Sequence, residues 1–540
     1  MTHDSDDRVT ATINGIEVSA APGTTIIQAA GKAGIEIPTL CYLEGLPVQS
    51  SCFLCVVDIE GREPLSPACA TPLPPGAVIH TDSARVIAAR KTCLELLLSD
   101  HAGSCVGNCT AACPANLEIA SFMDEVELGD YRAALQIIHR ALPLPATLGH
   151  VCAGHCESAC LRKDVDESLS IKRMHGLIAE TDMARPDPYI PPCQPSTGKR
   201  IAIVGAGPSG LSAAHYLLEQ GHDCLLYDAA EEPGGLLRYG MPVDLLDKSV
   251  IDAEWKIIGQ MGARFQPGWR LGRDGTLAAL RDEYDAVVLA IGAGVDWTTE
   301  SRSVDRELIE ELGLAFGRRG VDADRDTGAT RIPGVYAAGE VVSGISNTVR
   351  SIASGHRAAD AIGAQLASGK PATGKKWFFR ARMTDAERGE LFSRPAGKRA
   401  STVQLGAAIR SGDAGHAGGE ASRCLDCACV SLHSCRLRHY STRYNADPNR
   451  YAGGARRELA PDRSHPLVDY EPGKCILCGL CVAVADAESD RPGLTFSGRG
   501  FDTRVAVPFD QEIRRGIETS ARRCAEVCPS GAITLKRGRR

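Results

Sequence analysis

The stretch GKRIAIVGAGPSGLSAAHYLLEQGHDCLLYDAA, residues 198–230, decides the fold of the middle of this chain. An apolar strand, Arg200–Val204, runs directly into an Ala- and Leu-rich helix through a turn that carries Gly205, Gly207 and Gly210. Glycines at this spacing allow a tight turn, close approach of a pyrophosphate and close packing of helix on strand, while the helix N-terminus attracts phosphate. The stretch therefore predicts a βαβ unit that binds a dinucleotide.

An acidic residue completes this motif. Asp223–Tyr227 reads as a second strand, and Asp228 follows it at the position where an acid binds the ribose of the nucleotide. A lone glycine motif is a weak signal, but here the strand, the helix and the acid are all in place. Residues 195–370 are therefore expected to form a Rossmann-type domain.

Composition narrows the classes of function. The chain has 540 residues, enough for three to five domains, and its net charge of −7 with no basic stripe argues against nucleic-acid binding. The sequence contains no run of 18 apolar residues, so no membrane span is expected. The acidic start, Met1–Arg8, lacks the apolar run of a secretory signal. We therefore expect a cytoplasmic protein in which most of the 22 cysteines, which stand in tight groups, are metal ligands and do not form disulfides.

Residues 1–90 carry the first cysteine group. Thr10–Val18 and Leu54–Glu60 are strand-like, with a turn at Asn14-Gly15. A [2Fe–2S] cluster needs four thiolates, and a four-cysteine zinc site is the less favoured alternative because zinc more often uses two paired knuckles. The spacing resembles the N-terminal ferredoxin-like domain of the large iron–sulfur subunit of respiratory complex I and of iron-only hydrogenases, which implies a β-grasp fold. The ligands expected for this cluster are Cys41, Cys52, Cys55 and Cys69.

Residues 91–194 carry two groups of three cysteines at x3 spacing. Leu117–Arg140 between them reads as two short amphipathic helices with a break near Gly129. The region resembles the N-terminal iron–sulfur domain of the small subunit of bacterial glutamate synthase and of dihydropyrimidine dehydrogenase. That resemblance implies two [4Fe–4S] clusters, each with ligands from both groups.

The first of these groups departs from the family, which has four cysteines there. His101 stands four residues before Cys105, and imidazole can replace thiolate on cluster iron. His175 is near the position of the family's Glu or Gln ligand. If neither histidine binds, one cluster is incomplete or has three irons. The resemblance implies one cluster on His101, Cys105, Cys109 and Cys160, and another on Cys113, Cys152, Cys156 and His175.

The dinucleotide expected at residues 195–370 is FAD. Gly334–Val342 reads GVYAAGEVV, which resembles the second FAD motif of the glutamate synthase family, with Glu340 in place of the usual Asp. Family members insert a second, NAD(P)H-binding domain here, but about ten residues between Ala293 and Val304 are too few for a domain. The remaining flavin contacts that the resemblance implies are Gly235, Leu236, Gly339, Thr348 and Val349.

The last part of the chain follows a Gly/Ala-rich stretch, 371–420, expected to be a linker. Residues 421–455 place four cysteines within twelve residues, a pattern that favours a [4Fe–4S] cluster, with structural zinc as the alternative. Those cysteines are Cys424, Cys427, Cys429 and Cys435.

Residues 456–540 have the bacterial ferredoxin signature for one [4Fe–4S] cluster. This C-terminal region is also similar to the complex I subunit. Its expected ligands are Cys475, Cys478, Cys481 and Cys528, with Cys524 as an alternative.

These expectations describe a multidomain α/β and α+β protein with a β-grasp ferredoxin-like domain, a helical iron–sulfur domain, a Rossmann-type FAD domain and a bacterial-ferredoxin-like domain. No catalytic residue stands out. The leading hypothesis is an electron-relay subunit, with three to four [4Fe–4S] clusters, whose partners are other subunits of an oxidoreductase, an NAD-binding subunit or a soluble ferredoxin. The alternatives are a self-contained NAD(P)H- or ferredoxin-dependent oxidoreductase and a scaffold or sensor with structural clusters.

Overall fold

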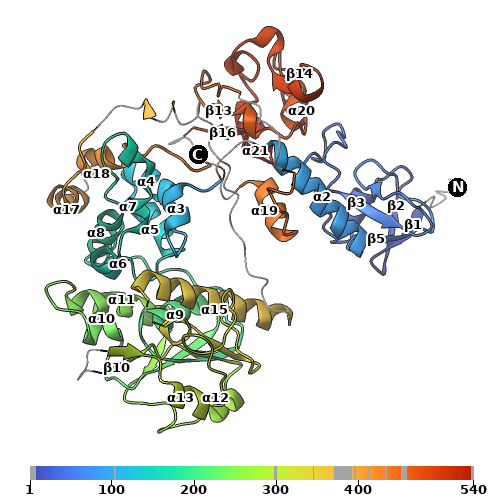
Figure 1. Ribbon diagram of the computed structural model, residues 1–540. Coiled ribbons are helices and arrows are strands. Elements are labelled where there is room, and N and C mark those ends of the chain that lie inside the picture. Colours follow the sequence, from blue (N-terminus) through green and yellow to red (C-terminus); the bar gives the residue numbers. More distant parts are fainter. Residues whose placement is uncertain are drawn as a thin grey trace. The chain divides into compact units, whose positions relative to one another are not determined.

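A computed structural model of the chain divides into two compact units (Figure 1). Unit 1 comprises residues 1–106, 376–390 and 428–540, and unit 2 comprises residues 107–375 and 391–427. Unit 2 is thus inserted in the sequence between the two main parts of unit 1. The residues described are 8–101, 105–296, 301–344, 346–369, 389, 392–393, 397–411, 414–429, 431, 434–451 and 459–536.

The first part of unit 1 is a mixed five-stranded sheet with the order β2-β1-β5-β3-β4. The β1–β2 hairpin turns at Asn14 and Gly15, both with positive φ, as the Asn-Gly pair predicts. A long helix, α2 (Ala84–Asp100), follows the sheet. The other elements are β1 (Val9–Ile13), β2 (Ile16–Ala20), α1 (Ile26–Lys32), β3 (Val56–Ile59), β4 (Ser66–Pro67) and β5 (Val78–His80).

The second part of unit 1 is built around an antiparallel pair, β13 with β16, against which α21 packs. Its core joins Val468 and Ile533 of these strands to Val484 of α20 and to Cys524. The elements are α19 (Arg436–Arg443), β13 (Val468–Tyr470), α20 (Leu480–Ala487), β14 (Thr495–Ser497), β15 (Arg504–Ala506), α21 (Ala521–Val527) and β16 (Ile533–Leu535).

Arg90 of α2 ties the two parts of unit 1 together. Its side chain is 3% exposed; Nε donates to the carbonyl of Leu54 and Nη2 to that of Val56, each at 2.9 Å. Nη1 donates to the hydroxyl of Tyr444, also at 2.9 Å. A buried guanidinium with three directed hydrogen bonds fixes both ends of the short segment that contains Cys55.

Unit 2 begins with helices that surround the second and third cysteine groups. The break expected near Gly129 is present, because α4 ends at Glu127 and Gly129 has φ of +78°. Helices α6 and α8 cross closely at Gly149 and Gly176. These helices are α3 (Asn108–Ala112), α4 (Ile119–Glu127), α5 (Tyr131–His139), α6 (Pro145–Val151), α7 (His155–Ser158) and α8 (Ile171–Met183).

The rest of unit 2 contains a parallel five-stranded sheet of order β12-β9-β6-β7-β8. Strands β6 (Arg200–Val204) and β7 (Asp223–Tyr227) have the limits expected from the sequence. The chain moves from β6 to β7 on one side and returns to β9 on the other, so ligands are expected at this switch point. The other strands of the sheet are β8 (Arg264–Gln266), β9 (Ala286–Leu289) and β12 (Val335–Ala337), while β10 (Gly294–Asp296) and β11 (Ser301–Ser303) form a separate antiparallel pair.

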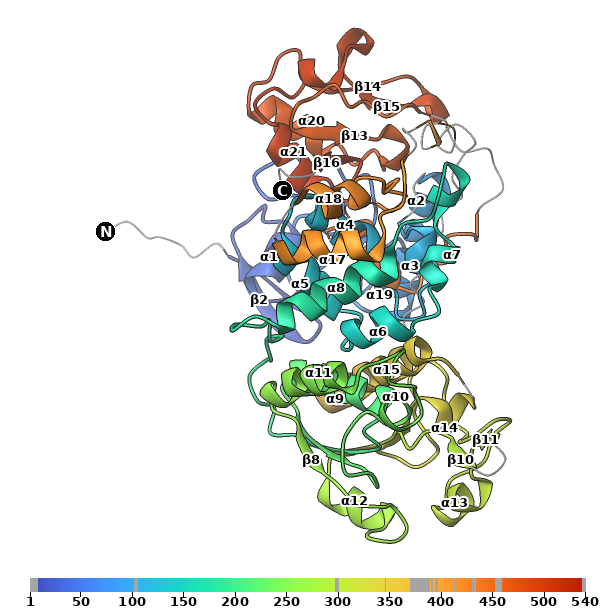
Figure 2. The same cartoon turned by 90° about the vertical axis from the view of Figure 1, so that its left-hand side faces the viewer.

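Two long helices, α9 (Pro208–Glu219) and α15 (Thr348–Ser368), pack together beside this sheet (Figures 1 and 2). A Cβ on Gly355 would lie 2.1 Å from the Ser209 carbonyl oxygen, so glycine permits this approach. The shorter helices are α10 (Leu236–Tyr239), α11 (Lys248–Gln260), α12 (Leu277–Glu283), α13 (Arg306–Glu311) and α14 (Glu340–Ser343).

The range expected to be a linker contains two helices in its described part. α17 (Thr402–Ser411) packs against α8, and α18 (Ala414–Ala421) packs against α4; Figure 2 shows α17 lying along α8. Leu405, Ala408 and Ala417 belong to the same core as the cysteines of the helical region. The small residues that resemble a linker therefore form close helix contacts instead.

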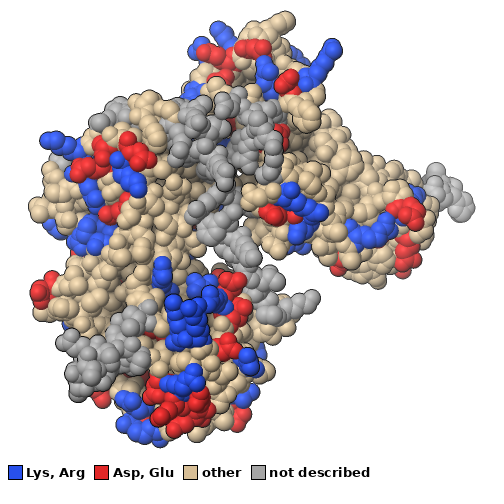
Figure 3. Space-filling model, viewed as in Figure 1, with Lys and Arg blue, Asp and Glu red and all other residues tan. Residues whose placement is uncertain are grey.

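No described helix is both long and apolar enough to cross a bilayer. On the face shown in Figure 3, the described Lys and Arg side chains lie among Asp and Glu in small patches, without a stripe of one sign.

We expect the substitution Gly176→Ala to destabilise unit 2. Its Cβ would lie 2.6 Å from the Cα of Gly149, so α6 and α8 would have to separate, at a cost of about 1–3 kcal/mol. Guanidinium unfolding measures the loss. Gly259→Ala in α11 is the control, because no atom lies within 4 Å of its Cβ position, and it should raise stability by about 0.5–1 kcal/mol. Equal effects of both variants would contradict the close crossing.

We expect Arg90→Leu to destabilise unit 1 by about 2–4 kcal/mol, because two buried carbonyls lose their donors. Arg85→Leu on the same helix is the control, since Arg85 is exposed and its ion pair with Asp58 is worth about 0–1 kcal/mol. Unfolding midpoints compare the two variants. A larger loss for Arg85→Leu would show that Arg90 does not hold the two parts together.

Candidate functional site

The first cysteine group forms two hydrogen-bonded pairs. Cys52 donates to Cys41, which also accepts from backbone N–H groups, and these bonds lower the pKa of the Cys41 thiol to about 5. Cys55 donates to Cys69, which lowers the pKa of the Cys69 thiol to about 7. All four residues are buried. Two thiol pairs, one for each iron, fit the ligand set of a [2Fe–2S] cluster.

The loop around these pairs has an unusual backbone. Ser50 and Phe53, neither of them glycine, have φ of +49° and +51°. Such conformations cost free energy and persist where the surrounding structure requires them. Here they let the loop turn its N–H groups toward the thiols, as an anionic group requires.

The C-terminal cysteine group has a similar arrangement. Leu477, with φ of +54°, donates its N–H to Cys475 Sγ at 3.4 Å, and Ile533 donates to Cys528 Sγ at 3.5 Å. Cys478 is buried, and burial and the charge of Cys528 raise its pKa. Backbone donors aimed at sulfur stabilise thiolates, so these residues fit the expected [4Fe–4S] ligand set.

Cys524, the alternative ligand, has other partners. It is fully buried, and its thiol lies 3.6 Å from the carbonyl oxygen of Cys481 and 3.6 Å from Ser520 Oγ. Its position in α21 makes it part of the core of unit 1.

His101 and Cys105 lie in unit 1 with the last two cysteines of the four-cysteine segment. Cys429 donates its N–H to the carbonyl oxygen of Cys105 at 3.4 Å. Burial and the charge of Cys429 raise the pKa of the Cys105 thiol to about 11. His101 is buried, and its Nδ1 lies 3.0 Å from the carbonyl oxygen of Lys474.

The remaining cysteines lie in unit 2. Burial, then the charges of Cys160 and Cys427, raise the pKa of the Cys109 thiol to about 12. Cys113 and Cys152 are neighbours of Cys156 and, after burial, raise its pKa. Cys109 therefore lies near Cys160 and Cys427, and Cys156 lies near Cys113, Cys152 and Cys109.

His175 is buried in α8. Its Nδ1 lies 3.1 Å from the carbonyl oxygen of Pro145, and burial lowers the pKa of the imidazole to about 4. A neutral histidine that donates from Nδ1 presents Nε2 to a metal, so the side chain is in a form suited to ligation. Beside Cys152, a hollow of about 350 Å³ is lined by Gly154, Lys163 and Lys172.

The glycine turn after β6 forms the expected cradle. Gly205 has φ of +109°, and a Cβ there would lie 2.3 Å from the Ala290 carbonyl oxygen. A Cβ on Gly210 would lie 1.8 Å from the Gly205 carbonyl oxygen. Gly207 is the N-cap of α9, and a Cβ on Gly235 would lie 2.9 Å from the Cα of Gly207. Positions 205, 210 and 235 therefore require glycine, which fits the close approach of a pyrophosphate.

Asp228, which was expected to bind a ribose, also accepts a hydrogen bond from the backbone of the glycine turn. Its Oδ2 accepts the N–H of Ala206 at 2.6 Å and its Oδ1 accepts that of Ala230 at 2.9 Å. The carboxylate thus holds the glycine turn in place, and its further lone pairs remain suited to a ribose hydroxyl.

The segment expected to be the second FAD motif, Gly334–Val342, runs through β12 into α14. Gly339 has φ of +83°, and its missing side chain leaves room for Ser209 Oγ. Glu340 accepts the N–H of Ser346 at 3.0 Å, which fixes the loop before Thr348 and Val349, the first residues of α15. Leu236 begins α10, next to Gly235.

Sequence reasoning missed three basic residues. Arg90, Lys474 and Arg423 are buried, and Arg90 donates to the carbonyls of Leu54 and Val56 on either side of Cys55. Arg423 and Lys474 stand immediately before Cys424 and Cys475, so their place in the sequence could have indicated a role beside the cysteines. The partners of Arg90 are known only from the fold. No described group of three or more His, Cys, Asp or Glu side chains lies close enough to hold a single metal ion.

Three family models match the chain. Residues 6–84 match a 2Fe-2S iron-sulfur cluster binding domain, residues 83–186 match dihydropyrimidine dehydrogenase domain II with its 4Fe-4S cluster, and residues 203–256 match an NAD(P)-binding Rossmann-like domain. These matches confirm the predicted [2Fe–2S] domain, the predicted helical [4Fe–4S] domain and a nucleotide- or flavin-type Rossmann fold.

Curated relatives match about a third to a half of the chain. The NADPH-Fe(3+) oxidoreductase subunit beta of Geobacter sulfurreducens is 35% identical over 34% of this chain and 28% of the relative. The glutamate synthase [NADPH] small chain of Bacillus subtilis is 34% identical over 35% of this chain and 39% of the relative. The dihydropyrimidine dehydrogenase subunit PreT of Salmonella typhimurium is 29% identical over 45% of this chain and 58% of the relative.

The chain thus spans between about a quarter and three fifths of the length of these relatives. The relatives are subunits of oxidoreductases, and the matched domains are those expected from the cysteine and glycine motifs. The chain is therefore similar, over part of its length, to subunits of oxidoreductases, and one polypeptide carries a 2Fe-2S domain, a 4Fe-4S domain and a Rossmann-like domain.

Proposed function

We propose that the chain is an electron-relay subunit of a multi-subunit oxidoreductase, which passes electrons between FAD in unit 2 and a series of iron–sulfur clusters. A flavin exchanges electrons in pairs and a cluster exchanges them singly, so the protein's part is to hold these groups in order. The observation that carries the proposal is that, within each unit, successive cysteine groups touch through named contacts.

The first contact in unit 1 joins the [2Fe–2S] loop to the C-terminal group. Gln49, between Cys41 and Cys52, lies against Gly479, where a Cβ would meet its Oε1 at 2.7 Å. Leu46 of the same loop packs against the core of the C-terminal part, as Cys475 and Cys481 do. Direct packing of the two loops supports electron transfer between their ligand sets.

The next contact in unit 1 joins the C-terminal group to Cys429 and Cys435. Pro529, directly after Cys528, accepts the N–H of Leu437 at 2.9 Å, and its carbonyl oxygen lies 3.6 Å from Cys435 Sγ. The Cβ position of Gly531 lies 3.7 Å from Cys429 Sγ. Three ligand sets of unit 1 are therefore consecutive neighbours.

In unit 2 a hydrogen bond joins the cysteine region to the flavin region. Cys109 is among the neighbours whose charge, after burial, raises the pKa of Cys156. His155, the residue before Cys156, lies with Nε2 3.1 Å from the side-chain nitrogen of Asn347. Asn347 caps α15, whose N-terminus faces the expected flavin position, so this bond supports a route from cysteine group to flavin.

FAD, rather than a nicotinamide nucleotide, is the cofactor proposed for the glycine turn. Between β9 and β12 the described residues contain only β10, β11 and α13 as regular elements, which leaves no room for a second nucleotide domain. Electrons would then enter or leave through an NAD-binding subunit or a soluble ferredoxin. Many free thiols that serve as ligands are compatible with a reducing compartment, so we propose the cytoplasm as its location.

The test is a reduction experiment on the anaerobically purified chain. We expect dithionite to bleach the flavin and cluster absorbance, and NADH or NADPH alone to leave it unchanged, because no nicotinamide domain is present in the proposed arrangement. Visible spectra recorded during each addition measure this.

Bleaching by NADH or NADPH would overturn the relay proposal and make a self-contained oxidoreductase the better description, as the NADPH-linked names of the relatives suggest. Chemical identification of the released cofactor as FAD is the accompanying control. A chain that loses its clusters and unfolds without any electron transfer would instead favour a scaffold.

A further inference from the structure

The four-cysteine segment lies where the chain passes from unit 2 to unit 1. Cys424 and Cys427 belong to unit 2, whereas Cys429 and Cys435 belong to unit 1. We propose that this segment holds no cluster of its own and instead supplies two ligands to each of two other clusters. The proposal rests on the proposed iron–sulfur function. The unit 2 cluster is held by Cys109, Cys160, Cys424 and Cys427. The unit 1 cluster is held by His101, Cys105, Cys429 and Cys435.

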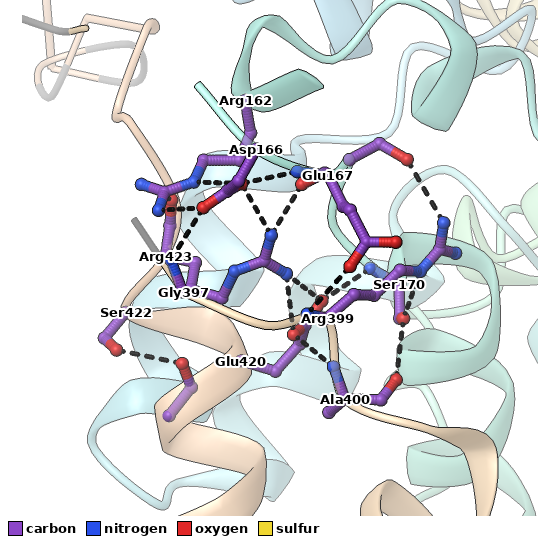
Figure 4. Close-up of polar contacts among 12 residues, drawn as sticks. Arg162, Asp166, Glu167, Ser170, Gly397, Arg399, Ala400, Glu420, Ser422 and Arg423 are labelled. Carbon is purple, nitrogen blue, oxygen red and sulfur yellow. Dashed lines mark hydrogen bonds and ion pairs between the residues drawn. The ribbon is translucent and has the colours of Figure 1, made fainter. Parts of the chain in front are cut away.

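A buried ionic network holds Arg423, at the start of the segment, against Arg162 and Asp166 (Figure 4). Arg162, two residues after Cys160, donates from Nη1 to the carbonyl oxygen of Arg423 at 3.2 Å. Arg423 immediately precedes Cys424 and donates from Nη2 to Asp166 at 2.8 Å and to the Glu167 carbonyl oxygen at 2.6 Å. The side chains of Arg162 and Arg423 are only 3% and 7% exposed.

The same network extends along the residues that precede the segment. Glu420 accepts from Nη1 of Arg423, from the N–H of Ser170 at 2.8 Å and from the N–H of Ala400 at 2.8 Å. Asp166 accepts the N–H of Gly397 at 2.8 Å. Buried charges that are paired and hydrogen-bonded this fully hold one geometry, because breaking any pair leaves a charge unpaired.

The cysteines themselves agree with this placement. Cys424 packs against the core that contains Cys160. The pKa of the Cys109 thiol is raised by burial first, then by the charge of Cys160 and then by that of Cys427. Asp426, between Cys424 and Cys427, has φ of +56°.

A residue with positive φ also lies inside each of the three other Cys-x2-Cys pairs of the chain, at Phe53, Leu477 and Gly479. The Cys424–Cys427 pair therefore has the backbone of a cluster-binding turn.

In unit 1 the other half of the segment meets His101 and Cys105. The N–H of Cys429 donates to the Cys105 carbonyl oxygen at 3.4 Å, and Cys435 Sγ accepts the N–H of Arg438 at 3.4 Å. His101 uses Nδ1 toward the Lys474 carbonyl, and a histidine oriented in this way binds a metal through Nε2.

Lys474 supplies positive charge to this set. It is buried and paired with Glu471, and although burial opposes its charge, Cys429, Glu471 and Cys105 raise the pKa of its ammonium group. A buried cation beside Cys105 and Cys429 offsets the charge that two thiolates bring into the interior.

The division leaves every ligand set with four members. It differs from the sets expected from the sequence. There the family resemblance puts Cys105 in one cluster with Cys109, and the spacing of Cys424–Cys435 gives the segment a cluster of its own. Cys105 and Cys109 are therefore assigned to different clusters, as are Cys427 and Cys429. The third [4Fe–4S] set of the middle region keeps Cys113, Cys152, Cys156 and His175.

Iron content of cysteine variants tests the division in the full chain. Cys427→Ser and Cys109→Ser should each lose one cluster, about four irons, and their double variant should lose no more. Cys427→Ser with Cys429→Ser should lose two clusters, about eight irons. Iron and acid-labile sulfide assays on anaerobically reconstituted protein measure the loss in each variant. The control is Cys193→Ser, an exposed cysteine outside every group, which should keep all its iron.

A loss of only one cluster in the Cys427→Ser/Cys429→Ser variant would overturn the division while leaving the relay function intact. Absence of [4Fe–4S] clusters from the unaltered chain would overturn the relay function itself. Should the variants fail to fold, iron-edge anomalous diffraction from crystals of the unaltered chain decides. Two separate clusters bonded to Cys427 and Cys429 support the division, and one shared cluster refutes it.

Discussion

Many thiols have to be gathered inside this protein against the cost of burying them together. Burial raises the pKa of Cys105 and Cys109, and neighbouring cysteines raise it further, so isolated thiolates would be unfavourable there. The polypeptide offsets part of this cost with backbone donors, such as Leu477 N–H, and with the buried cation Lys474. Bound iron would supply the remaining positive charge, so we regard the folded interior and its metal content as interdependent.

Local signals in the sequence predicted much of the fold. Strands β6 and β7 have the expected limits, and the Asn14-Gly15 hairpin and the break at Gly129 are present, because each is set by residues adjacent in the chain. The helices α17 and α18 were not foreseen, since Gly- and Ala-rich sequence resembles a linker until its packing partner is known.

The sequence indicates which residues are candidate ligands, but it does not indicate which of them would share a cluster. Spacing identifies a Cys-x2-Cys turn, whereas the partner of Cys427 depends on Arg423 and Asp166, which are far apart in the sequence and paired only in the fold. Asp228 shows the same limit at the nucleotide site. Its place after β7 was predictable, but its bond to Ala206, which holds the glycine turn, follows from tertiary geometry.

The insertion of unit 2 within unit 1 has a consequence for synthesis. After Val106 leaves the ribosome, roughly 320 residues follow before the second main part of unit 1 begins at Ala428, on the order of 20–60 s at 5–20 residues per second. During that interval the β-grasp sheet can form, but Arg90 lacks its partner Tyr444 and His101 lacks Lys474. The nascent N-terminal region therefore exposes the surface that the second part of unit 1 will later cover. Chaperones or cluster-delivery factors would have to protect this surface until that part has been translated.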